Sequence, residues 1–339
     1  MKKQFSVPLA PFTTFHIGGA ARVFIEAHSE KEIQEAIAYA HENNLSLYPL
    51  GAGSNLLVPD AGVEGVVLKM ASHTIAFEKE GDDTLLVADA GTPWGKVVGA
   101  ASEQNLFGIE NLAGIPGTIG GASIQNIGAY GAELADAFVY ADCIDGITGE
   151  KKRITRADAA FGYRASFFKA HRAVIITRVA LRLSKNASPN IAYADLARAH
   201  ESGISLSTPR EISDAIRAIR AKKFPLSEKE GTAGSFFKNP IISPEQADLL
   251  RNHFPDIPLF PQDDGTIKIT LAWLLDHALS LKGFSRGRVR LYEKQPLIIV
   301  ARGGATATEV GALADEIAKR VFDATGIVIE REVEMFGTR

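Results

Sequence analysis

Three segments of the chain carry a side chain suited to acid–base or carboxylate chemistry. Arg164 lies in an aromatic stretch, and Ser235 directly follows a glycine and precedes two phenylalanines. Glu330, Glu332 and Glu334 alternate in a run that reads as a strand, so they would share one face. Arginine suits a carboxylate ligand, and a positioned hydroxyl can transfer a proton. Each segment also has a structural interpretation: the arginine stacks on its neighbours, the serine caps a turn, and the glutamates face water.

Two glycine-rich stretches suggest a site for a phosphate-bearing ligand. Residues 114–131 contain six glycines and one proline, and the second stretch is Gly51-Ala-Gly-Ser-Asn-Leu56. Glycine lets the main chain adopt positive φ and touch a ligand. Successive N–H groups in such a loop form a concave site for a diphosphate. We therefore expect a large phosphate-bearing ligand held mainly by backbone groups, with tight turns in a β-rich domain as the alternative.

The common nucleotide and metal motifs are absent from the sequence. Leu56 stands where a dinucleotide fingerprint needs its third glycine, and Gly91-Thr-Pro-Trp-Gly-Lys96 is one residue short of a P-loop. The eight histidines include no pair at ligand spacing, so no metal is expected. Cys143 is the only cysteine, which excludes an intrachain disulfide and fits a reducing compartment.

Length and charge narrow the class of protein. A chain of 339 residues is too long for one ordinary core and suggests two or three domains. The net charge of -3 gives no electrostatic reason to expect nucleic acid or an acidic membrane surface. No signal peptide and no apolar run of about 18–20 residues is visible. We expect a cytoplasmic monomer without nucleic-acid or membrane partners.

Capping residues and hydrophobic periodicity predict an α+β chain. Helices are expected after Ser29, at Pro93, at Pro209 and over 243–253, 270–281 and 306–324. Strands are expected at 45–50, 63–69, 84–90, 137–147, 172–183, 295–302 and 327–335. Residues 185–207 show no strong periodicity and read as a long loop. A polar stretch at 226–231 follows a helix stop, and we place a domain boundary there.

Together these motifs resemble one enzyme family, UDP-N-acetylenolpyruvoylglucosamine reductase. The resemblance runs nearly end to end. It rests on seven blocks in the right order: Thr14-Phe-His-Ile-Gly18, Gly51-Ala-Gly-Ser-Asn-Leu56, Gly114-Ile-Pro-Gly-Thr-Ile-Gly-Gly121, Gln125-Asn-Ile-Gly-Ala-Tyr-Gly131, Phe161-Gly-Tyr-Arg164, Gly234-Ser-Phe-Phe-Lys-Asn-Pro240 and Glu330-Arg-Glu-Val-Glu-Met-Phe-Gly337. The resemblance implies an FAD-binding fold of the vanillyl-alcohol-oxidase type plus a smaller α+β substrate-binding domain.

The resemblance also implies a division of the chain. Residues 1–225 would form the FAD-binding region, with lobes at about 1–60 and 61–225. Residues 226–332 would bind the substrate, and a tail at 333–339 would return to the FAD region. The chain is also similar to the subtype with a substrate-covering tyrosine loop, because Ala192-Tyr-Ala-Asp195 falls at the matching place.

By the same resemblance, NADPH reduces FAD, and N5 of the reduced flavin delivers hydride to the enolpyruvyl group of a UDP-sugar in peptidoglycan precursor synthesis. Arg164 and a protonated Glu332 would stabilise the enolate, and Ser235 would give a proton to the α-carbon. The residues implied to bind FAD are Gly51, Ala52, Gly53, Ser54, Asn55, Leu56, Gly114, Pro116, Gly117, Thr118, Gly120, Gly121, Ala122, Gln125 and Asn126. Those implied to bind the substrate are Tyr163, Tyr193, Lys223, Lys238, Asn239 and Gln295.

Two residues depart from the family pattern, and two other functions stay open. Arg331 stands where many relatives carry proline, and Tyr292 where many carry histidine. A related flavin oxidase acting on a sugar or lactone would share the fold but leave Ser235 and Glu332 without a role. A nucleotide-sugar-binding module without catalysis would lack the yellow cofactor.

Overall fold

The computed structural model of the protein describes residues 1–225 and 230–337, and the chain divides into two compact units. Unit 1 comprises Met1–Val7, Ala20–Gly53 and Val63–Lys222. Unit 2 comprises Pro8–Gly19, Ser54–Gly62 and Lys223–Arg339. The domain boundary expected at 226–231 falls largely on residues 226–229, which lie outside the described residues.

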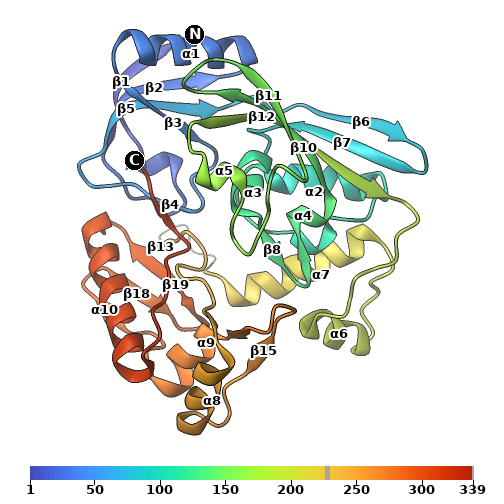
Figure 1. Cartoon of the computed structure of the whole chain (residues 1–339), viewed down its shortest axis with the longest axis vertical. Coiled ribbons are helices and arrows are strands. Elements are labelled where there is room, and N and C mark those ends of the chain that lie inside the picture. Colours follow the sequence, from blue (N-terminus) through green and yellow to red (C-terminus); the bar gives the residue numbers. More distant parts are fainter. Residues whose placement is uncertain (226–229, 338–339) are drawn as a thin grey trace. The chain divides into compact units, whose positions relative to one another are not determined.

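The first sheet of unit 1 contains parallel strands covered by one helix (Figure 1). Its strands, in the order β1-β2-β5-β3, are β1 (Lys3–Pro8), β2 (Ala20–Ala27), β5 (Val63–Met70) and β3 (Ser46–Leu50). β5 pairs in parallel with both β2 and β3, and its buried valines and leucine form the continuous apolar run typical of parallel strands. Helix α1 (Glu30–Glu42) starts after Ser29 as expected and buries Ile33 and Ile37 in the core of this unit.

The second sheet of unit 1 is antiparallel. Its strands, in the order β11-β10-β12-β7-β6, are β11 (Lys151–Thr155), β10 (Phe138–Asp145), β12 (Val174–Ser184), β7 (Asp83–Asp89) and β6 (Ile75–Glu80). Successive side chains alternate between faces, so Leu86 and Ala88 enter the main core while Val87 packs with Ala180 on the other face. The strands predicted in this region are confirmed, with bounds shifted by one or two residues.

Short helices and turns of unit 1 connect these strands. They are α2 (Trp94–Glu103), the 3₁₀ turn η2 (Glu110–Leu112), α3 (Ile119–Gln125), α4 (Leu134–Ala137), α5 (Phe167–Ala170), α6 (Ala194–Glu201), α7 (Pro209–Lys223), and the hairpin of β8 (Gly128–Ala129) and β9 (Ala132–Glu133). α7 begins at Pro209 as predicted, and Thr208 and Glu211 satisfy each other's backbone N–H groups. Pro93 precedes α2 rather than opening it.

Unit 2 has its own sheets and helices around a separate core. One sheet has the order β13-β19-β18-β17, with β13 (Glu230–Gly231), β19 (Gln295–Arg302), β18 (Val289–Tyr292) and β17 (Ser285–Arg286). The others comprise β14 (Ile241–Ile242), β16 (Ile267–Ile269) and β15 (Leu259–Pro261), and the parallel pair β20 (Glu334–Met335) and β4 (Leu56–Leu57). The helices are η1 (Ala10–Phe12), α8 (Pro244–His253), α9 (Leu271–Trp273), the π-helix η3 (Leu274–Ala278) and α10 (Ala307–Thr325). α10 buries Leu313 and Ile317 against this core.

Three predicted elements are wrong in the structure. The helix expected at 270–281 is one turn, α9, followed by a π-helix, because wider hydrogen bonds such as Leu279 N to Leu274 O replace the α pattern. The loop expected at 185–207 contains helix α6, which buries only Leu196 and therefore gives no periodic signal. The strand expected at 327–335 is limited to Glu334–Met335, because the preceding residues bond irregularly to two different segments.

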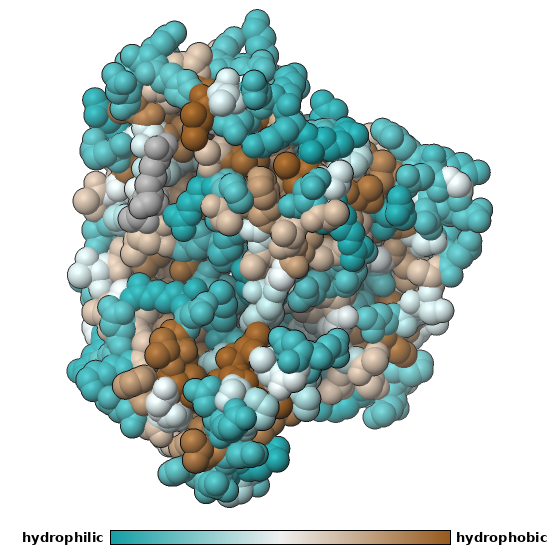
Figure 2. Space-filling model, in the orientation of Figure 1, coloured by the Kyte–Doolittle hydropathy of each residue, from teal (hydrophilic) through white to brown (hydrophobic). Residues whose placement is uncertain are grey.

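The described surface is mostly hydrophilic on the face shown in Figure 2, where hydrophobic side chains gather in small groups. Large apolar side chains that are exposed include Phe5, Ile147, Leu249 and Val328. Isolated apolar residues at the surface are ordinary for globular proteins. Within residues 1–225 and 230–337, every helix is too short or too polar to cross a membrane.

Candidate active site

Gly51 and Thr118, one from each glycine-rich loop, lie close together in unit 1. A Cβ built on Gly51 would come within 2.7 Å of Thr118 Oγ1. Lys69 donates its Nζ to the Gly51 carbonyl, and Thr118 caps α3 by accepting from Gly121 N at 3.3 Å. The Thr118 side chain thus packs directly against the main chain of Gly51, where only a glycine leaves room for it.

The glycines of these loops divide into packing positions and open positions. A Cβ on Gly120 would lie 2.9 Å from Ala90 Cβ, so the protein's own packing requires this glycine. A Cβ on Gly121 would meet only Thr118 Oγ1, at 3.6 Å, and Gly53 has a φ of +62°. Gly114 is confined by Arg220, whose Nε donates to the Gly114 carbonyl at 3.1 Å. Gly121 is therefore the position where an added side chain tests for a ligand.

Arg164 sits at the tip of a tight turn in unit 1. Gly162 and Ala165 exchange backbone hydrogen bonds of 3.0 and 3.1 Å across the turn, and Arg164 has a φ of +53°. A non-glycine residue in this left-handed region is strained, and such strain collects at functional sites. The guanidinium donates Nη2 to Gly128 O at 2.8 Å, which fixes one arm of the fork.

Asn126 holds this turn in place. Its side chain is fully buried, and Nδ2 donates to Gly162 O at 3.0 Å and to Glu133 Oε2 at 2.8 Å. Its Oδ1 accepts from Ala135 N at 3.0 Å. The Asn126 side chain, implied to bind FAD, is therefore fully engaged inside the protein and positions the Arg164 turn. Its neighbour Gln125 accepts from Lys169 Nζ at 3.1 Å.

The Ser235 segment lies in unit 2 beside the segment that carries Glu332. Ser235 forms an antiparallel bridge with Ile298 on β19. The next carbonyl, Phe236 O, accepts from Glu332 N at 2.8 Å. Both Ser235 and Glu332 are half-buried. The structure thus joins, through a main-chain hydrogen bond, two segments that lie almost one hundred residues apart in the sequence.

The three glutamates of the 330–334 segment differ in exposure, and the strand expected there is limited to Glu334–Met335. Glu330 is exposed and pairs with Lys238 Nζ at 2.8 Å. Glu332 is half-buried, and Asn55 Nδ2 donates to its carbonyl at 3.0 Å. Glu334 N then bonds to Asn55 O at 3.1 Å. Within this segment the main-chain hydrogen bonds pass from the chain around Phe236 to Asn55, so the segment does not form one regular strand.

Arg331, the departure beside Glu332, is anchored within unit 2. Its guanidinium pairs with Asp315 on α10 and lies 5.9 Å from the ring centroid of Phe236. Phe237 forms an antiparallel bridge with Arg331. The arginine therefore helps to hold the strip of chain that carries Glu332.

The residues implied to bind the substrate differ in their hydrogen bonds and in their exposure. Gln295 Oε1 is buried and has no hydrogen-bond partner in the described part of the chain, so it is a candidate acceptor for a ligand donor. Asn239 Oδ1 accepts from Leu271 N at 3.1 Å and so supports the start of α9. Tyr193 is 46% exposed at the start of α6, and Lys223 ends α7.

The predicted site residues are divided between the two units. Unit 1 holds Gly51, Ala52, Gly53, Gly114, Pro116, Gly117, Thr118, Gly120, Gly121, Ala122, Gln125, Asn126, Tyr163, Arg164 and Tyr193. Unit 2 holds Ser54, Asn55, Leu56, Lys223, Ser235, Lys238, Asn239, Gln295 and Glu332. The sequence analysis missed Asn111 and Arg220, two polar residues that donate to main-chain carbonyls near these loops. Asn111 precedes Leu112 in the sequence, but its burial is visible only in the structure.

Comparison with known proteins decides the family. The "FAD binding domain" model matches residues 21–155, and the "UDP-N-acetylenolpyruvoylglucosamine reductase, C-terminal domain" model matches residues 225–336. The UDP-N-acetylenolpyruvoylglucosamine reductases of Pseudomonas savastanoi pv. phaseolicola and Pseudomonas aeruginosa are 39% and 41% identical over 339 residues, covering 99% of each chain. The chain belongs to the UDP-N-acetylenolpyruvoylglucosamine reductase family.

A solved structure of this reductase family supports the fold along the whole chain. The enzyme from Thermus caldophilus is 25% identical, with a TM-score of 0.67 and coverage of 99% of this chain and 98% of that one. The predictions of an FAD-binding fold with a second α+β domain, and of an FAD-dependent oxidoreductase, are confirmed by this membership.

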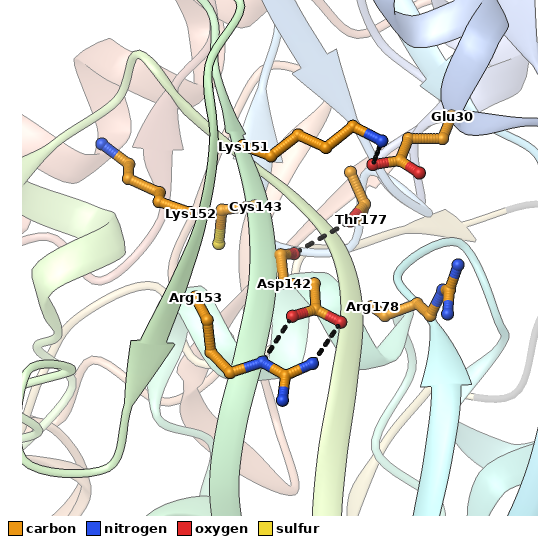
Figure 3. A pocket seen from close by; sticks show the side chains of 8 residues that line it. All are labelled: Glu30, Asp142, Cys143, Lys151, Lys152, Arg153, Thr177 and Arg178. Carbon is orange, nitrogen blue, oxygen red and sulfur yellow. Dashed lines mark hydrogen bonds and ion pairs between the residues drawn. The ribbon is translucent and has the colours of Figure 1, made fainter.

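One further cavity of this reductase lies in unit 1, and none of the predicted site residues lines it (Figure 3). It has a volume of about 290 Å³. Arg153 donates to both carboxylate oxygens of Asp142, at 2.7 and 3.1 Å, and Lys151 pairs with Glu30 at 2.9 Å. Because these cations already have carboxylate partners, an anionic ligand would have to displace a carboxylate there.

Cys143 contributes to the lining of this cavity but should be unreactive. Its side chain is 2% exposed, and burial raises the pKa of the thiol to about 12. The thiol therefore stays protonated at pH 8, and the thiolate is the reactive form. We expect a thiol reagent to label the native reductase negligibly and to label one thiol per chain in denaturant. Rapid labelling of the native protein would contradict this burial.

Proposed function

We propose that this chain catalyses the NADPH-dependent reduction of UDP-N-acetylglucosamine enolpyruvate to UDP-N-acetylmuramate, in peptidoglycan precursor synthesis, as a cytoplasmic monomer. Family membership supports the reaction. The observation that carries the assignment of residues is the 2.8 Å bond between Glu332 N and Phe236 O, because it joins the segments of the proposed acid and the proposed carboxyl.

FAD would be held by the two adjacent glycine loops. Their fit to a diphosphate rests on the close approach of Gly51 to Thr118 and on the open position at Gly121. When bound, FAD takes a hydride from NADPH and supplies it to the β-carbon of the enolpyruvyl group. Asn126 supports this arrangement indirectly through the turn that presents Arg164.

Arg164 would bind the substrate carboxylate and stabilise the negative charge that develops when the β-carbon receives hydride. A guanidinium presents parallel donors that match a carboxylate. The bond from Nη2 to Gly128 O sets the plane of the fork before substrate arrives. The strained φ of +53° is consistent with a residue held for function.

Ser235 would donate the proton that the α-carbon takes, and a protonated Glu332 would bind the same carboxylate as Arg164. A serine hydroxyl is a weak acid, so its neighbours must orient it. The bridge to Ile298 and the Phe236–Glu332 bond fix the backbone on either side of Ser235. Asn55 fixes the Glu332 carbonyl from the other direction.

The polar residues implied to bind the substrate would hold the nucleotide sugar. Lys223 and Lys238 would balance the diphosphate charge, with Asn239 and Gln295 as positioning groups and Tyr163 beside Arg164. The buried, unpaired Gln295 Oε1 supports this role for that residue within the described chain. Tyr193 would belong to a substrate-covering segment, as in the tyrosine-loop subtype.

Flavin binding can be tested at Gly121. We expect Gly121→Val to yield protein with a native far-UV spectrum but little or no absorbance at about 450 nm, because an added Cβ makes only an ordinary contact with protein, 3.6 Å from Thr118 Oγ1, and would extend into the space proposed for the ligand. Gly95→Ala is the matched control: Gly95 is an exposed helical glycine with open space at its Cβ, and this variant should keep its flavin. Full flavin retention in Gly121→Val would place the site elsewhere.

The reaction is tested by following NADPH at 25 °C with the purified yellow protein. We expect NADPH consumption only when the enolpyruvyl UDP-sugar is present, with UDP-N-acetylmuramate as product. Consumption that depends on oxygen and on a sugar or lactone would favour the oxidase alternative. Colourless protein that binds the nucleotide sugar would favour a binding module.

A further inference from the structure

We propose that Asn111 is a positioning residue that couples the Tyr193 segment to the hairpin holding Arg164. This inference rests on the proposed function for its kinetic consequence, but its structural part stands alone. The hairpin is β8–β9, and the Tyr193 segment comprises residues 187–196. All of the residues concerned lie in unit 1.

Asn111 ties both elements through a single side-chain amide. It lies in the 3₁₀ turn η2 and is 2% exposed. Nδ2 donates to Tyr130 O at the hairpin tip at 2.8 Å, and also to Asn190 O at 2.8 Å. Oδ1 has no hydrogen-bond partner among the described residues, so the two donated bonds alone fix the amide. Because both acceptors are carbonyls, only a side chain with two N–H donors satisfies them.

The Tyr193 segment also contacts the tip of the same hairpin directly. Asn190 Nδ2 donates to Gly131 O at 3.0 Å. The Tyr193 ring packs edge to face on the Tyr130 ring, with 5.3 Å between their centroids. Asn190 and Tyr193 are themselves exposed, so these contacts attach an otherwise solvent-facing segment. Both Asn111 and the Tyr193 segment therefore bind the hairpin tip.

The other end of the hairpin holds Arg164. Gly128 O, in β8, accepts from Arg164 Nη2 at 2.8 Å. Tyr130 and Gly131 have φ values of +49° and +79°, as the two central residues of a tight hairpin turn require, and only the non-glycine Tyr130 carries strain there. The bonds from Asn111 and Asn190 help to hold this turn. Freeing the tip should therefore loosen the Tyr193 segment and shift the acceptor that orients Arg164.

Hydrogen exchange tests the coupling in the free protein. Asn190→Ala is the main variant, because Asn190 is exposed and its removal should not prevent folding. We expect faster exchange both in residues 187–196 and in the hairpin 128–133. Asn186→Ala, an exposed neighbour whose backbone N–H alone makes the recorded bond to Ser184, should leave the hairpin unchanged. Unchanged exchange in 128–133 for Asn190→Ala would overturn the coupling, whatever reaction the protein catalyses.

Steady-state kinetics test the consequence of this coupling for substrate binding and turnover. We expect Asn190→Ala to raise the KM for the UDP-sugar about fivefold while kcat changes little, as loss of one hydrogen bond predicts. Asn111→Asp has the same shape but lacks both donors, and it should raise KM by more and also lower kcat, because the Arg164 hairpin moves too. The double variant should be no worse than Asn111→Asp alone.

Additive effects, or Asn111→Asp kinetics equal to those of Asn186→Ala, would reduce Asn111 to a structural residue. If Asn111→Asp does not fold, Asn111→Ala takes its place, because it removes both donated bonds without burying a charge, and it is judged by its KM and by exchange in residues 187–196 and in the hairpin. Absence of turnover in the wild-type protein would instead refute the proposed function and leave the exchange result to judge the coupling.

Discussion

Ser235→Ala should slow the reaction of reduced enzyme with the enolpyruvyl UDP-sugar by several powers of ten, at or above the usual contribution of a general acid, about 10²–10⁴-fold. Flavin reduction by NADPH should stay nearly intact, because the hydroxyl acts only when the α-carbon takes its proton. Rapid mixing of each half-reaction separates the two steps.

The control for this variant is Ser285→Ala, an exposed serine of unit 2 on β17, which should behave as wild type. The backbone at Ser235 is fixed by the bridge to Ile298 and by its neighbours, so loss of the hydroxyl should leave the fold unchanged. Reaction of Ser235→Ala with the sugar within a few-fold of wild type would show that the serine is a structural cap.

Arg164→Lys should be the second damaging change, although it keeps the charge. A lysine ammonium is a point charge and cannot give two parallel donors to a carboxylate. The guanidinium bonds to Gly128 O and Asn126 O would also be lost, so a single ammonium there would be poorly oriented. We expect a loss of about 10²-fold or more in kcat/KM for the sugar, with normal flavin content.

Arg156→Lys is the matched control, since Arg156 is an exposed arginine of the same unit that also donates to a main-chain carbonyl, Asp136 O at 3.1 Å. It should turn over normally. Near-normal turnover of Arg164→Lys would show that Arg164 only stacks and holds its turn, for example against Tyr163, whose ring centroid lies 5.3 Å away.

Local patterns predicted most of the regular elements, because their signals are local. The start of α7 follows from Thr208, Pro209 and Glu211, and strands β7, β10 and β12 of the second sheet follow from apolar runs, whereas the mostly polar β6 and β11 were missed. The wrong predictions arise where distant partners decide. Glu332 leaves strand geometry where its own N–H bonds to Phe236 O and its carbonyl accepts from the Asn55 side chain, and nothing near Glu332 in the sequence indicates Asn55 as a partner.

The makeup of the units also depends on contacts that no local pattern reveals. Residues 54–62 belong to unit 2, and Asp60 accepts from the N–H groups of Ala307 and Thr308 at the start of α10. Likewise the sequence placed glycines in the proposed cofactor loops without showing that Gly120 packs on Ala90 whereas Gly121 is open. The motifs indicated which residue types belong to the site, but only the structure showed which of them pack against the protein and which are open to a ligand.

The most direct test of the central claim is a single turnover without oxygen. Enzyme reduced by one equivalent of NADPH is mixed with the enolpyruvyl UDP-sugar, and absorbance at about 450 nm and product are measured together. We predict that the flavin band returns and that one UDP-N-acetylmuramate forms per flavin. A band that returns only when oxygen is admitted, with no UDP-N-acetylmuramate formed, would contradict it.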